Sequence, residues 1–146
     1  PHAFLGIARN GLSAIMHTTG NRDSHLVLRG GTDKPNYDKD SVYRAADILK
    51  KENIESGILI DCSHGNSRRI PSKQKDVLLK SLALRFSKDA SAECIRGCML
   101  ESFIQAGAVS PDCSTKTKEY GKSITDPCLS WEMTEALIAQ AANLLK

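Results

Sequence analysis

Four side chains able to act on a ligand follow apolar segments of the sequence. Arg29, His64 and Glu101 each come after a separate apolar run, and Asp126 lies in the polar segment beyond Glu101. One imidazole and two carboxylates form a mixed nitrogen and oxygen set, which suits Mn, Fe, Co or Zn, whereas Mg prefers oxygen alone. The set therefore predicts a divalent metal site. Arg29 precedes two glycines, and a guanidinium fork beside an approachable backbone suits a phosphate.

Each of these residues also has a structural interpretation. A single His after a strand is more often a loop hydrogen-bonding group, and Arg29 and Glu101 could be solvated or paired surface charges. Asp126 precedes a proline, where Asp is an ordinary turn residue. Arg68 and Arg69 are interpreted as a solvated pair ahead of the next helix.

Composition narrows the class of protein. The 146 residues are 40% hydrophobic and 25% charged, which predicts one globular domain over residues 1–146. A net charge of +3, scattered along the chain, gives no reason to expect nucleic acid. We expect no membrane span, because no apolar run approaches ~18 residues.

The cysteines indicate the cellular compartment. Five cysteines without a CxxC pair predict free thiols in a reducing, cytoplasmic location. Cys62, two residues from His64, is a weak candidate for a thiolate ligand. The chain begins at Pro1 without a methionine, which raises the possibility of a fragment.

The elements that must position these groups alternate along the chain. Asn10-Gly11 between two short apolar runs predicts a β-hairpin over residues 3–19. Three β-α units follow, which imply a parallel sheet covered on both faces or closed into a barrel. The expected strands are 24–31, 56–62 and 94–102. One expected helix begins near residue 40 or 41, the other two cover 73–87 and 129–145, and a long polar loop covers 105–128. The residues expected to face inward are Val42, Ala45, Ala46 and Leu49; Val77, Leu78, Leu82 and Phe86; and Met133, Ala136, Leu137, Gln140, Ala141 and Leu144.

Four motifs carry a resemblance to a known family. They are LRGG…PNY (28–37), IDCSHGNS (60–67), MLES (99–102) and YGKSITDPCLSWE (120–132). Over nearly its whole length the chain resembles the C-terminal part of the microbial class I 3-deoxy-D-arabino-heptulosonate 7-phosphate (DAHP) synthases. The resemblance implies an α/β fold, the C-terminal portion of a (β/α)8 TIM barrel with about three βα units plus an inserted β-hairpin. It also implies condensation of phosphoenolpyruvate with erythrose 4-phosphate, the first step of the shikimate pathway to aromatic amino acids.

The resemblance assigns residues to roles. His64, Glu101 and Asp126 match three of the family's four metal ligands, and Arg29 matches an arginine that contacts the phosphoenolpyruvate phosphate. No other catalytic residue is expected. In the hairpin, Phe4, Gly6 and Met16 match positions that line an aromatic amino-acid effector site, and Gly6 indicates a tyrosine- or tryptophan-regulated type. The alternative is that the hairpin serves only packing and oligomer contact.

The resemblance also shows departures. The family's metal-binding Cys and its further Lys and Arg residues belong to the first barrel strands, which nothing here matches. After ESF the chain reads IQAGAVSP and lacks a Glu that the family usually carries. We therefore expect the isolated chain to be inactive, and to need a homo-oligomer or a complementary N-terminal segment for a well-packed state. The alternatives are a catalytically inactive fragment or remnant that retains a partial metal or effector site, and a different metal-dependent aldolase.

Overall fold

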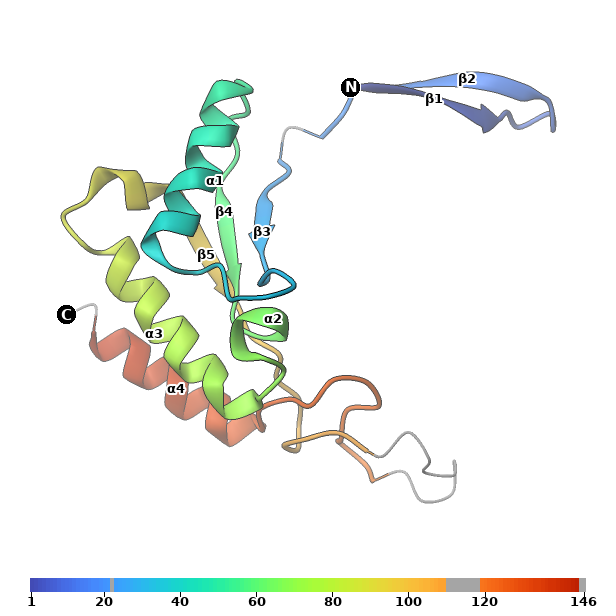
Figure 1. Ribbon diagram of the computed structural model, residues 1–146. Coiled ribbons are helices and arrows are strands. Elements are labelled where there is room, and N and C mark those ends of the chain that lie inside the picture. Colours follow the sequence, from blue (N-terminus) through green and yellow to red (C-terminus); the bar gives the residue numbers. More distant parts are fainter. Residues whose placement is uncertain (22, 110–118, 145–146) are drawn as a thin grey trace.

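The protein contains a three-stranded parallel sheet with helices between its strands (Figure 1). A computed structural model describes residues 1–21, 23–109 and 119–144. The sheet consists of β3 (Leu26–Leu28), β4 (Ile58–Asp61) and β5 (Ile95–Met99), in that order. The longer helices are α1 (Lys39–Lys51), α3 (Gln74–Arg85) and α4 (Trp131–Asn143), and the short helical turns are α2 (His64–Ser67), η1 (Pro71–Lys73) and η2 (Ala90–Cys94). The α/β class with a parallel sheet, expected from the sequence, is confirmed.

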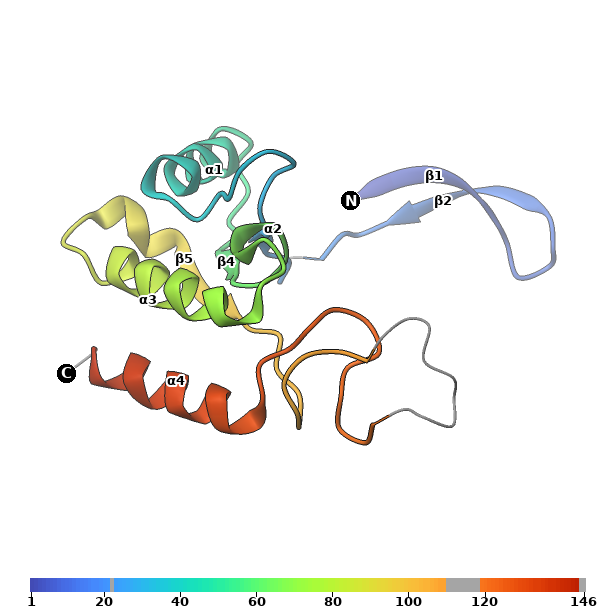
Figure 2. The same cartoon turned by 60° about the horizontal axis from the view of Figure 1, so that its bottom comes forward.

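Helices pack on one face of this sheet. Side chains alternate along a strand, so Ile58 and Ile60 point to one face and Leu59 to the other. Ile58 and Ile60 are completely buried, whereas Leu59 and its β3 partner Val27 are only half-buried. Figures 1 and 2 show α1, α3 and α4 on the same side of the sheet. Of the two arrangements expected from the sequence, a sheet with helices on both faces is therefore not what the described residues form.

The helices contribute narrow apolar stripes to the core. Asp38 caps α1, where its side chain accepts a 3.0 Å hydrogen bond from the backbone N–H of Ser41. The core joins buried residues of the sheet and of all three long helices. Its members are Leu28, Val42, Ala45, Ile58, Ile60, Cys62, Val77, Leu78, Ile95, Leu129, Leu137 and Ala141.

Some of the inward-facing residues expected from the sequence are exposed instead. Phe86 follows the end of α3 and is 59% exposed. In α4 only Thr134, Leu137 and Ala141 are buried, because this helix packs mainly against α3. The expectation was wrong for Met133, Ala136, Gln140 and Leu144, which are exposed. Leu145, the expected end of this helix, lies outside the described residues.

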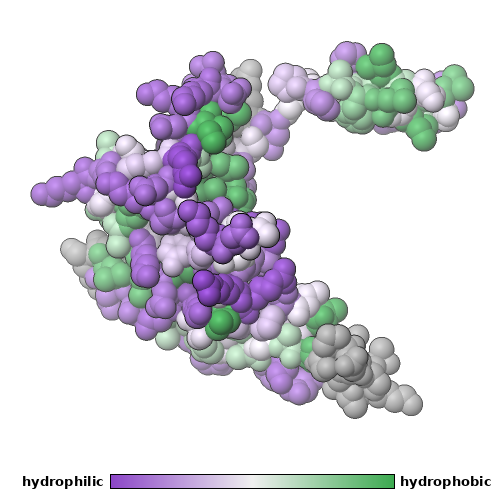
Figure 3. Space-filling view, viewed as in Figure 1, coloured by the Kyte–Doolittle hydropathy of each residue, from purple (hydrophilic) through white to green (hydrophobic). Residues whose placement is uncertain are grey.

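The N-terminal hairpin extends away from this core (Figures 1 and 2). It consists of β1 (His2–Ile7) and β2 (Ser13–Thr18), paired from His2↔Thr18 to Ile7↔Ser13. Figure 3 shows apolar surface over much of it. Within the described part of the chain, no helix is long and apolar enough to cross a membrane.

Candidate metal centre

The three ligands expected from the sequence converge at the carboxyl end of β4. His64 begins α2, three residues after the last residue of β4. Its Nε2 atom lies 3.6 Å from Glu101 Oε1 and 3.6 Å from Asp126 Oδ2. One ligand atom from each of the three side chains lies within 4.8 Å of the others. The segments that carry them are far apart in sequence, so only the fold brings the three groups together.

A buried carboxylate holds the imidazole in this orientation. Asp61 is 2% exposed, and its Oδ2 lies 2.7 Å from His64 Nδ1. The backbone N–H of Ser63 donates to Asp61 Oδ1 at 2.8 Å and fixes that carboxylate in turn. A histidine held this way presents its other ring nitrogen as a lone pair, which is the usual arrangement around a protein-bound metal. The donor set and its supporting hydrogen bonds therefore fit a divalent cation.

The two other carboxylates are also held in place. Ser63 Oγ donates to Glu101 Oε2 at 2.5 Å. Arg69 Nη1 donates to Asp126 Oδ1 at 2.7 Å, which leaves Oδ2 on the side of His64. Arg69 is exposed, as its interpretation as part of a solvated pair expects, and it also pairs with one of the expected ligands. Asp61 and Ser63 were not assigned these positioning roles, although both lie within three residues of His64 in the IDCSHGNS motif.

The turn that carries His64 packs closely against the end of β3. Gly30 has a φ of +90°, and a Cβ atom there would lie 2.5 Å from the carbonyl carbon of Gly65. The Gly65 N–H donates to the carbonyl of Arg29 at 3.0 Å. The buried side chain of Asn66 donates to the carbonyls of Leu28 and Asp61. Close contact between the two loops thus depends on glycine at position 30.

The same turn contains unusual backbone conformations. His64, Arg68 and Arg69 have φ values of 42°, 55° and 57°, in the left-handed region that non-glycine residues rarely occupy. The N–H of Arg69 donates to the carbonyl of His64 at 2.8 Å and closes the turn. This conformation directs Arg69 toward Asp126.

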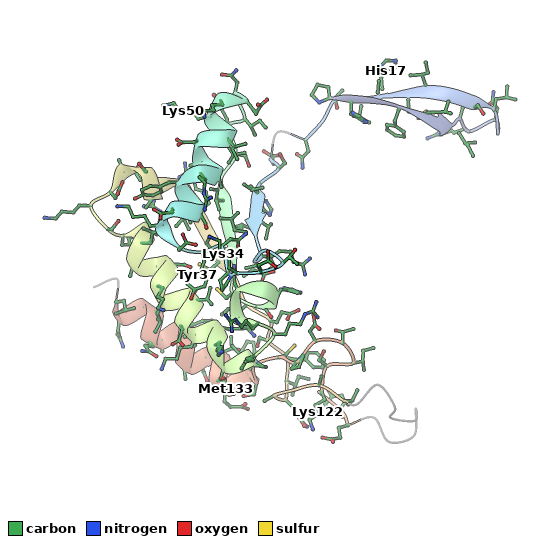
Figure 4. All side chains as sticks on the ribbon, viewed as in Figure 1. His17, Lys34, Tyr37, Lys50, Lys122 and Met133 are labelled. Atoms are coloured by element: carbon green, nitrogen blue, oxygen red, sulfur yellow. The ribbon has the colours of Figure 1, made fainter. Side chains whose placement is uncertain are left out.

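A basic cavity of about 300 Å³ adjoins His64. Lys34, in the loop after β3 (Figure 4), contributes to its lining. Arg29 is exposed at the end of β3 and is not among the lining residues. Lys34 was not singled out from the sequence, although it lies directly before PNY (35–37) in that motif. The full lining is Gly31, Thr32, Asp33, Lys34, Pro35, His64, Gly65, Arg68 and Arg69.

Cys62 does not belong to this group of ligands. It is completely buried and lies in the hydrophobic core. A hydrogen bond with Cys98, together with burial, raises the pKa of its thiol. Cys62, only a weak candidate from the sequence, is not among the three side chains that converge. Residues 110–118 of the long polar loop lie outside the described residues.

The three expected effector residues share one face of the hairpin. Phe4 pairs with Met16 across the two strands, and both side chains are partly exposed. A Cβ atom on Gly6 would lie 2.7 Å from Met16 Cγ, so a side chain there would have to displace Met16. Phe4, Gly6 and Met16 therefore adjoin one another on the hairpin. The hairpin itself extends away from α2, which His64 begins (Figure 1).

Comparison with known proteins was made at the level of sequence and of structure. The family model described as the DAHP synthetase I family matches residues 1–139. The tyrosine-inhibited phospho-2-dehydro-3-deoxyheptonate aldolase of Schizosaccharomyces pombe is 40% identical and covers 100% of this chain, which spans 39% of that protein. The Phe-sensitive enzyme of Escherichia coli K12 is also 40% identical, and the chain spans 40% of it. A solved phospho-2-dehydro-3-deoxyheptonate aldolase from Francisella tularensis superimposes with a TM-score of 0.80 at 38% identity, over 98% of this chain and 40% of that one. The chain thus spans about two fifths of the length of these relatives.

Proposed function

The chain belongs to the DAHP synthetase I family, and on this premise we propose that it carries the C-terminal part of a DAHP synthase active site. The reaction is the condensation of phosphoenolpyruvate with erythrose 4-phosphate, the first step toward aromatic amino acids. The observation that carries the proposal is the convergence of His64, Glu101 and Asp126 within 4.8 Å. The names of the similar enzymes from S. pombe and E. coli support the same activity.

The fold that we propose is the C-terminal portion of a TIM barrel. Parallel strands in the order β3-β4-β5, with helices on one face only, are typical of a barrel segment whose other face points to the barrel interior. The expected ligands lie at the carboxyl ends of the strands or in the loops beyond them, which is where such barrels place their active sites. The similarity to the F. tularensis enzyme supports this arrangement.

His64, Glu101 and Asp126 are the residues that would hold a divalent cation, with Mn, Fe, Co or Zn favoured by the mixed donor set. When bound, such a cation supplies Lewis acidity toward an aldehyde oxygen or a water. The chain's own residues orient the ligands: Asp61 fixes the imidazole, and Ser63 and Arg69 each fix one carboxylate.

Anionic substrates would meet a basic surface beside this centre. We assign Arg29 to the phosphoenolpyruvate phosphate. Lys34 and Arg68, which line the cavity beside His64, add positive potential there. The hairpin face of Phe4, Gly6 and Met16 is the proposed effector surface for an aromatic amino acid. Both relatives described above are named for sensitivity to such a compound.

Binding without turnover is the second candidate for the isolated chain. Within the described residues, β3 and β5 each pair on one side only. Unpaired strand edges favour association with another polypeptide. We therefore propose that a second copy of the chain or a complementary N-terminal segment covers these edges. Turnover would require the N-terminal segment, because a second copy cannot supply ligands that this sequence lacks.

Calorimetric titration of Mn²⁺ into the chain and its His64→Ala variant tests the metal centre. We expect the affinity to fall at least tenfold, because one of three ligands is lost. His17→Ala is the matched control, since His17 lies on the distant hairpin (Figure 4). Equal affinity of the chain and the His64 variant would remove His64 from the ligand set. A phosphoenolpyruvate consumption assay tests the second candidate, and turnover by a monomer of this chain would contradict it.

A further inference from the structure

We propose that Gln74 is a positioning residue for the metal centre, a role that rests on the function proposed above. Gln74 is the first residue of α3 and is completely buried. Its side chain forms two hydrogen bonds with the backbone of Glu101. The Nε2 group donates to the Glu101 carbonyl at 3.1 Å, and the Glu101 N–H donates to Oε1 at 2.8 Å. Gln74 thus holds a proposed ligand without touching the cation itself.

These bonds replace strand pairing at the point where the sheet ends. The ladder between β4 and β5 runs to Asp61↔Met99, and the Cys62 N–H donates to the Met99 carbonyl just beyond it. Glu101 lies two residues further along the chain. A primary carboxamide offers one donor and one acceptor in nearly the geometry of a peptide group. The Gln74 side chain therefore continues the hydrogen-bonding pattern of the sheet for one more residue.

Both the backbone and the carboxylate of Glu101 are therefore held by hydrogen bonds. Its carbonyl also accepts from the Leu129 N–H at 3.0 Å, on the segment that leads into α4. Its carboxylate accepts from Ser63 Oγ, and the other oxygen lies on the side of His64. If the backbone of Glu101 were free to rotate, the carboxylate could keep the bond to Ser63 or face the cation, but the structure would no longer enforce both.

Gln74 is well suited to this role because its own position is rigid. It lies in the first turn of α3, whose residues Val77 and Leu78 are buried in the core. Val77, Leu78 and Ser81 are all buried on this helix, so no single one of them sets the position of Gln74. Groups that orient metal ligands from behind typically affect metal affinity by 10- to 100-fold.

Mn²⁺ titration of the full chain, followed by calorimetry and by the electron paramagnetic resonance signal of free Mn²⁺, tests this role. The variants are Gln74→Met, which keeps the length but removes both hydrogen bonds, and Gln74→Asn, which keeps the amide but is too short to span both backbone groups. We expect the affinity to fall at least tenfold for Gln74→Met and at least threefold for Gln74→Asn. Val77→Ala is the control, because it loosens α3 without touching Glu101. It should lower the thermal midpoint and leave Mn²⁺ affinity within twofold.

The outcomes separate this proposal from the one on which it rests. Wild-type affinity in either folded Gln74 variant, with weak binding by His64→Ala, would overturn the role of Gln74 and leave the metal centre intact. Affinity lost equally in Val77→Ala would also overturn it, because general loosening of α3 would then explain the effect. If the unmodified chain binds no Mn²⁺, both proposals fail. Should Gln74→Met not fold by circular dichroism, the Gln74→Asn variant decides the question.

Discussion

Asp61 Oδ2 lies 2.7 Å from His64 Nδ1, and this contact decides which ring nitrogen faces Glu101 and Asp126. Asp61 ends β4 and is almost fully buried, so its position is set by the sheet. The hydrogen bond to Asp61 therefore fixes the orientation of the imidazole as well. The metal centre is therefore built on the end of a strand, although His64 itself lies in a turn.

The first prediction concerns this contact. Asp61→Asn keeps the shape of the side chain but replaces a carboxylate by an amide, which can turn its NH₂ group toward Nδ1. We expect Mn²⁺ affinity to fall by roughly 10- to 100-fold. Asp76→Asn, an exposed change on α3, is the control and should bind as the unmodified chain does. Calorimetric titration measures both, and an unchanged affinity for Asp61→Asn would show that His64 needs no carboxylate partner.

The second prediction concerns the close approach of Gly30 to Gly65. Gly30→Ala places a methyl group against backbone atoms at 2.5–2.6 Å, in addition to its strained φ. Gly11→Ala is the matched control, because Gly11 has a similar φ of +81° with no atom within 4 Å of the added Cβ. Strain alone should cost about 1 kcal/mol of unfolding free energy at Gly11, and Gly30→Ala should cost clearly more. Chemical denaturation measures the two values, and equal losses would contradict a steric role for Gly30.

The third prediction concerns the cap of α1. Asp38→Ala removes the acceptor for the Ser41 N–H and should cost about 1 kcal/mol of unfolding free energy. Asp38→Asn keeps an acceptor oxygen and should cost much less at neutral pH. Thermal or chemical denaturation distinguishes the two variants, and equal losses would show that the acceptor oxygen at position 38 does not stabilise the helix.

The same residue predicts a pH dependence. Burial opposes ionisation of Asp38, but hydrogen bonds from the side chain and backbone of Ser41 outweigh it and lower the pKa of this carboxyl. A lowered pKa in the folded state means that the stabilisation is fully present above the unfolded-state value near 4. It is lost as the pH falls through the lower folded-state value. The advantage of the unmodified chain over Asp38→Asn should therefore shrink as the pH falls below about 4, and a constant difference would contradict the assignment.

The fourth prediction concerns self-association through the hairpin. Leu5 and Ile15 pair across the two strands and are 77% and 69% exposed. Exposed apolar pairs of this kind favour protein contacts. The double change Leu5→Lys and Ile15→Lys should shift the chain toward the monomer in sedimentation velocity. Ser13→Lys adds charge on the same face without removing apolar surface, and an equal shift there would attribute the effect to charge alone.

Local patterns in the sequence were sufficient to predict the alternation of strands and helices. Apolar runs ending in His64 and Glu101 placed both residues at strand ends, and parallel strands bring such ends together. The inward stripe of α1 was also predictable, since Val42 and Ala45 follow helical spacing. The stripe of α4 was not, because spacing cannot reveal that a helix has few neighbours.

The long-range hydrogen bonds that support the site could not be predicted from local sequence patterns. Gln74 and Glu101 are separated by 27 residues, and Arg69 and Asp126 by 57. Nothing in the residues around Gln74 distinguishes it from an exposed glutamine in the first turn of a helix. Only the fold shows that it is buried and paired with the backbone of another element.

The left-handed conformations at His64, Arg68 and Arg69 have a consequence for heat resistance. Each such backbone is costly for a residue with a side chain, and glycine would relieve that cost. Screening for thermal endurance alone would therefore favour glycine at positions 68 and 69. Both variants would outlast the parent on heating, yet the one at position 69 would give up the arginine that orients Asp126. At position 69 of this turn, the substitution that would raise thermal stability is therefore not the one that would preserve the metal centre.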